Sequence, residues 1–61
     1  MTKSEKKQLD LIEVYMDNQM QDTAARSLSS LIRSAMTNKS REFFIQRAID
    51  LNLTNRPEFI I

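Results

Sequence analysis

The residues that come nearest to a chemical pattern are three acids, Asp10, Glu13 and Asp17, which recur at i, i+3 and i+7. At that spacing a helix places the three carboxylates in a row along one face. Such a row is typical of a solvated helix face, and it could also meet a basic partner, including a basic helix of the same chain. Carboxylate oxygens suit divalent cations, but the row lacks the loop that dedicated calcium sites use. We therefore expect no metal site here.

Three serines, Ser27, Ser30 and Ser34, repeat the same spacing farther along the chain. Small side chains let another helix approach closely, so this strip could be a helix crossing or a dimer surface; a solvated face is the alternative. A serine nucleophile needs a neighbouring base, and the chain has no histidine. It also has no cysteine for a zinc site and no glycine for a phosphate-binding loop. We expect a protein that is not an enzyme and binds no cofactor.

The cations are unevenly distributed along the chain. Residues 1–22 carry three lysines and five acids, whereas residues 24–47 carry five cations and the single acid Glu42. A basic segment at a turn between two helices could place cations on phosphates and a glutamine against a base edge, as helix-turn-helix proteins do. The candidate nucleic-acid residues are Arg33, Lys39, Arg41, Gln46 and Arg47.

The segment Ser40–Ile49 contains a serine followed by an arginine, an apolar pair and, eight residues after the serine, an alanine. It resembles the second helix of ribbon-helix-helix repressors. The resemblance implies a dimer in which a short strand, here residues 14–21, pairs with its copy and reads the major groove, with Gln19 and Gln21 facing the bases. The chain departs from the family pattern at Asn38, where the turn usually has a glycine, and the segment of the implied strand has poor β-propensity and contains an acid.

Apolar periodicity predicts the elements that must position these residues. The clearest stretch is residues 24–36, where apolar and polar side chains separate into two arcs at about 100° per residue. The absence of glycine and the single proline also favour helix over turns and strands. We predict an all-α fold of three short helices, at approximately residues 5–20, 23–36 and 39–52, with a C-terminal tail packed onto them.

Neither predicted break contains a glycine, so capping residues have to end and start the helices. Asp22 or Thr23 is the predicted N-cap of the second helix. Asn38 is predicted to end that helix in a left-handed conformation, and Asn38 or Ser40 to cap the third helix. One uninterrupted helix over residues 4–36 is the alternative to the first break.

A chain of 61 residues forms one small domain, residues 1–61, at most. Such a domain buries only about 60% of the surface that its unfolded chain exposes, so small domains usually need a disulfide, a metal or a partner chain. With no cysteine or histidine, we expect self-association to complete the fold, as a homodimer. The candidate interface residues are apolar side chains at the end of the first helix, on the wet side of the third helix and in the tail: Met16, Met20, Phe43, Phe59, Ile60 and Ile61.

These observations favour a small regulatory or adaptor protein that acts by binding another, larger protein. A dimeric DNA-binding regulator of the helix-turn-helix or ribbon-helix-helix type is the alternative, and an assembly protein whose only partner is itself is a third. The chain contains neither a signal-type segment nor the run of about 18 apolar residues that spans a bilayer, so we expect a cytoplasmic protein without membrane contact.

Overall fold

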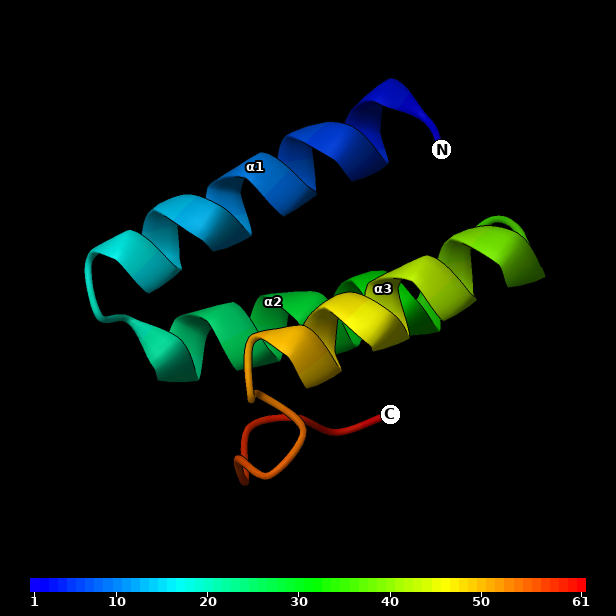
Figure 1. Ribbon diagram of the computed structural model, residues 1–61. Coiled ribbons are helices and arrows are strands. Elements are labelled where there is room, and N and C mark those ends of the chain that lie inside the picture. The colour runs from blue at the N-terminus through cyan, green and yellow to red at the C-terminus, as the bar shows by residue number, and fades with distance from the viewer.

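The chain reverses its direction twice and so forms three helices of similar length. The computed structural model describes residues 1–61, with α1 at Lys3–Asp17, α2 at Gln21–Arg33 and α3 at Asn38–Asp50. No strand is present, which confirms the prediction of an all-α fold of three short helices. α1 and α3 both run antiparallel to α2, and the C-terminal segment lies on the side of α2 and α3 away from α1 (Figure 1). No helix combines the length and the apolar character needed to cross a membrane.

Helix α2 is the centre of the packing. α1 and α3 each pack against α2, but no Cα atom of α1 lies within 8 Å of a Cα atom of α3. Of the nine buried core residues, five come from the predicted apolar arc of α2, and the others come one from α1, two from α3 and one from the segment after α3. The full set is Ile12, Ala24, Ala25, Leu28, Leu31, Ile32, Phe44, Ala48 and Leu53.

The first break lies at residues 18–20, earlier than predicted, because α1 ends in a Schellman motif. Gln19 has a φ of 59°, in the left-handed region. The N–H of Met20 donates to the Tyr15 carbonyl over 2.8 Å, and the N–H of Gln19 donates to the Met16 carbonyl over 3.1 Å. This pair of bonds satisfies carbonyls that the end of a helix leaves without partners. A glutamine therefore occupies the position that glycine usually takes.

This turn contradicts two of the expectations for residues 14–21. The uninterrupted helix over residues 4–36 is excluded, since the left-handed residue ends α1. The strand that the ribbon-helix-helix resemblance implies is also absent, because Val14 to Asp17 are the last turn of α1 and Gln21 is the first residue of α2.

The N-cap of α2 is also different from the one predicted. α2 begins at Gln21 with Met20 as its N-cap, and no side chain makes a capping hydrogen bond there. Asp22 and Thr23 therefore lie inside the first turn, where the charge of Asp22 is favourable to the helix dipole.

The second break depends on Thr37. This residue is the N-cap of α3, and its hydroxyl oxygen accepts a hydrogen bond from the Ser40 N–H over 3.0 Å. Asn38 is the first residue of α3 and is not in the left-handed region, and Ser40 is a buried residue of the first turn, so both predicted caps are wrong. The threonine lies one position before the expected cap and supplies the same chemistry.

The end of α3 repeats the Schellman motif with an asparagine. Asn52 has a φ of 58°, and the N–H of Leu53 donates to the Ala48 carbonyl over 2.9 Å. Leu53 is buried beside the helix that it leaves, which directs the C-terminal segment back towards α2. α3 therefore ends at Asp50, slightly before the predicted end at residue 52.

Glu5 connects the start of α1 to the turn before α3. Its side chain accepts a hydrogen bond from the Thr2 N–H over 2.9 Å in a capping box, and its second oxygen accepts one from the Met36 N–H over 3.3 Å. The Thr2 hydrogen bond is the main cause of a lowered pKa of the Glu5 carboxyl; burial opposes this shift and the Met36 bond adds to it.

A glycine at position 19 tests the first turn. The left-handed conformation costs an L-residue about 1–2 kcal/mol, and glycine adopts it freely. We expect Gln19→Gly to raise the free energy of unfolding by roughly 1 kcal/mol, measured by urea denaturation. The control Gln8→Gly, in the interior of α1, should instead lower that free energy, and equal destabilisation by the two variants would contradict the turn described here.

Replacement of Glu5 tests its two hydrogen bonds through their pH dependence. A carboxyl whose pKa is lowered in the folded chain stabilises the fold above its ordinary pKa of 4.5, and this stabilisation is lost as the pH falls through the lower folded value. We expect Glu5→Gln to be less stable than the wild type at pH 7, with a difference that narrows below pH 4.5. Glu42→Gln, at an exposed position, is the matched control. A difference in free energy of unfolding between Glu5→Gln and the wild type that stays the same in acid would refute the lowered pKa of Glu5.

Candidate functional site

A groove runs between α1 and α3. Both helices pack against α2 but not against each other. The groove has a volume of about 400 Å³. Five of its nine lining residues are apolar, namely Met1, Leu9, Ile12, Phe43 and Leu51. Ile12 is buried, Leu9 and Leu51 are half-buried, and Phe43 is 45% exposed. The groove therefore leads from a large exposed aromatic ring down to the core.

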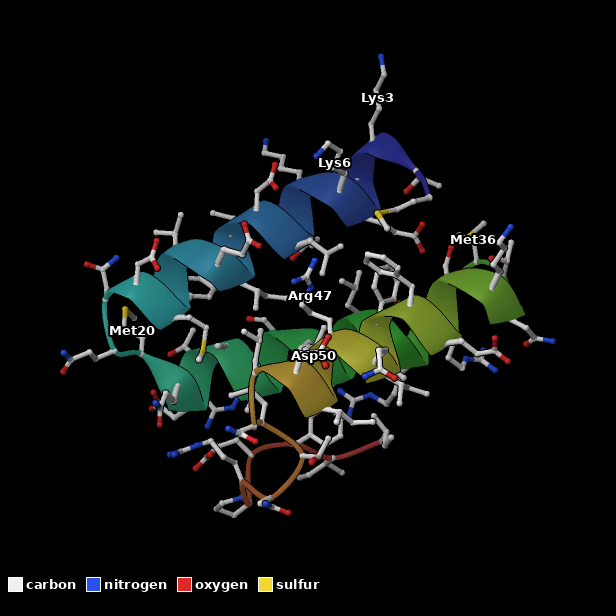
Figure 2. The ribbon with its side chains drawn as sticks, in the orientation of Figure 1. Lys3, Lys6, Met20, Met36, Arg47 and Asp50 are labelled. Carbon is white, nitrogen blue, oxygen red and sulfur yellow. The ribbon has the colours of Figure 1, made fainter.

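The ring of Phe43 is held in place from two sides. It lies edge-on against the buried ring of Phe44, with the centroids 6.1 Å apart and an interplanar angle of 82°. The guanidinium carbon of Arg47 lies 5.8 Å from the Phe43 centroid, one helical turn away on α3. Figure 2 shows the Arg47 side chain reaching into the space between α3 and α1. Both contacts favour a defined ring position over free rotation in solvent.

The charged residues of the groove balance in sign and have no ion pair within the chain. Lys6, Asp10 and Glu13 line it from α1, and Arg47 lines it from α3. The only ion pair of the structure is elsewhere, between Arg56 and Glu58. Two acids of the row predicted from the sequence, Asp10 and Glu13, thus line the groove, whereas Asp17 does not. The carboxylates of the row belong to no group that could hold a metal ion.

The C-terminal segment occupies a different side of α2. Phe59 packs partly buried against the core, and the N–H of Ile60 donates to the Ser29 hydroxyl oxygen over 3.0 Å. The Ser29 hydroxyl in turn donates to the Ala25 carbonyl over 2.7 Å, and Arg33 donates to the Ile60 carbonyl. The predicted tail packing is therefore present through Phe59, whereas the side chains of Ile60 and Ile61 remain exposed, at 64% and 63%.

The six candidate interface residues consequently lie in separate places. Phe43 lines the groove, and the tail residues lie on the side of α2 away from α1 (Figure 1). Met16 packs partly buried against the core, and Met20 is 41% exposed at the turn between α1 and α2. Of this set, the structure assigns only Phe43 to the groove.

The candidate nucleic-acid residues are not gathered on one surface. Arg33 is bonded to the tail, Arg47 lies over Phe43, and the Gln46 amide donates to Asp50 over 3.0 Å. Lys39 and Arg41 are exposed in the first turn of α3. The face of α3 that carries Gln46 also carries two acids, at i−4 and i+4 from it, which is unfavourable beside phosphates. DNA binding stays a prediction that this arrangement does not favour.

A second, larger groove of about 620 Å³ lies between α1 and α2 and contains the predicted serine strip. Ser27, Ser30 and Ser34 line it together with Arg26, and only two of its ten lining residues are apolar. The strip opens onto this groove opposite the start of α1. No buried side-chain polar atom in the structure is without a hydrogen-bond partner, so nothing in this groove points to a ligand.

Two features of these sites escaped the sequence interpretation. Ser29 lies on the polar arc of α2 but is only 1% exposed, because the tail covers it. The i, i+4 spacing places Phe43 and Arg47 on the same face of the helix, but the contact of the guanidinium with the ring was not predicted. The groove itself has no local sequence signal, since it results from the packing of α1 and α3 on a third helix.

Comparisons with known protein families, with curated proteins and with solved structures find no match for this chain. A function is therefore inferred from the chain's own residues.

Proposed function

We propose that this chain is a small, non-enzymatic regulatory protein that acts by binding another protein chain, and that the groove between α1 and α3 is its binding surface. The observation that supports this function is the exposed, well-positioned Phe43 ring at the edge of a groove that leads to the core. Covering this ring with a partner chain would remove apolar surface from water, which is favourable.

The composition of the groove supports a protein partner. Aromatic residues, methionine and arginine are enriched at protein interfaces, and this groove contains Phe43, Met1 and Arg47. Residues that dominate binding energy are typically aromatic or arginine side chains in pockets surrounded by polar groups. Here the apolar centre is flanked by Lys6 and the acids of α1.

The same charges favour protein over nucleic acid as the partner. A nucleic-acid surface needs cations without intervening acids, because phosphate contacts supply most of the affinity. The groove carries as many acids as cations, since it is lined by Lys6 and Arg47 and by Asp10 and Glu13. A protein surface can meet both signs at once.

Photo-crosslinking in the cells that make this chain tests the proposal. We expect Phe43→p-benzoylphenylalanine to give a discrete crosslinked species, identified by mass spectrometry, because position 43 faces the bound chain. Ile49→p-benzoylphenylalanine is the matched control: Ile49 is 50% exposed on the same helix but does not line the groove.

A crosslink to any protein chain that forms at position 43 and not at position 49 supports the proposal, whichever chain is captured. Equal yields at the two positions, or no crosslink at position 43, would contradict it.

A further inference from the structure

We infer that the groove between α1 and α3 is where two copies of this chain associate, with α1 of each copy lying over α3 of the other. This inference rests on the proposed function and names the partner: a second copy of the same chain. It is carried by the distribution of charge in the groove, by its geometry and by the small size of the domain.

The groove is complementary to itself. A two-fold interface brings the same patch of both copies together, so every cation in it needs an acid within the same patch. The patch carries two cations and two acids: Lys6, Asp10 and Glu13 on the α1 wall and Arg47 on the α3 wall. None of these four groups has an ion-pair partner within its own chain.

The parallel arrangement of α1 and α3 determines how the two copies meet. Both helices run antiparallel to α2 and so parallel to each other (Figure 1). A two-fold axis parallel to the groove places α1 of one copy against α3 of the other. Residues at the same height along the groove then lie opposite each other. Because Arg47 and the acids line one groove, the axis brings Arg47 of each copy to Asp10 and Glu13 of the other.

The same arrangement buries the apolar centre. The Phe43 ring of each copy faces the half-buried Leu9 side chain on α1 of the other copy, since both residues line the groove. A stable interface covers about 800 Å² on each partner, which is roughly a fifth of this chain's 4299 Å² of accessible surface. Burial of this surface would add to the stability of a 61-residue domain that has no disulfide.

Charge exchange between two variants tests this arrangement. One variant is Arg47→Glu, and the other combines Asp10→Lys with Glu13→Lys. In each variant alone the contact between the copies joins like charges, so we expect its homodimer dissociation constant to rise at least about tenfold over the wild type. Mixing the two variants joins opposite charges at both contacts, so a heterodimer should form.

Sedimentation equilibrium of the full chains measures the dissociation constants of the homodimers and of the heterodimer. Circular dichroism verifies that each variant is helical. Arg41→Glu is the matched control, since Arg41 is an exposed cation of α3 outside the groove, and its dimer should have the affinity of the wild type. Restoration of the dimer on mixing also excludes misfolding as the cause of the losses.

Three results would overturn the inference: a wild type that is monomeric at every concentration, a dimer that Arg47→Glu does not weaken, or variants that stay monomeric when mixed. A monomeric wild type that still crosslinks to a different protein through position 43 would leave the proposed function standing and reject only the second copy as partner.

Discussion

The fold depends on the burial of one face of α2. This helix carries five of the nine core residues, and it is the only helix that both of the others contact. α1 contributes a single fully buried apolar residue, Ile12, so its position depends on packing against α2 and on the hydrogen bonds of Glu5 at its start. A helix this short is marginal in water by itself, and tertiary contacts supply most of its stability.

The groove follows from this arrangement. Two helices that pack on a third without packing on each other leave the space between them to be filled by side chains or by a partner. Here the side chains fill it only partly: Ile12 closes its base, while Phe43 remains at the edge with its ring fixed by Phe44 and Arg47. The opposite side of α2 is different, because the tail covers it through Phe59 and Ser29. The chain's own tail thus covers one side of α2, whereas the groove on the other side is only partly filled by the chain's own side chains.

The sequence predicted those parts of the fold that depend on local periodicity. The apolar arc predicted over residues 24–36 contains the five core residues of α2, because a 3.6-residue repeat is visible without knowledge of the neighbours. Met36, at the end of that arc, instead lies beyond α2 and is 73% exposed. α1 and α3 end before the predicted residues, since Gln19 and Asn52 adopt the left-handed conformation that is usually signalled by glycine. α2 ends at Arg33 and not at the predicted residue 36, and its C-cap Ser34 has a φ of −103°, outside the left-handed region. Ser29 falls on the polar arc of the predicted helix, and its burial has no local signal because the segment that covers it lies 31 residues away in the chain. Exposure of Phe43 was anticipated, but the groove around it joins residues of α1 and α3 and has no local signal.

An isotope-filtered NOE experiment on an equal mixture of labelled and unlabelled chain tests most directly whether a second copy covers the α1–α3 groove. We expect intermolecular NOEs from the Phe43 ring to the methyl groups of Leu9. Intermolecular NOEs confined to Ile60 and Ile61, or none from Phe43 in a sample that is dimeric, would contradict this arrangement.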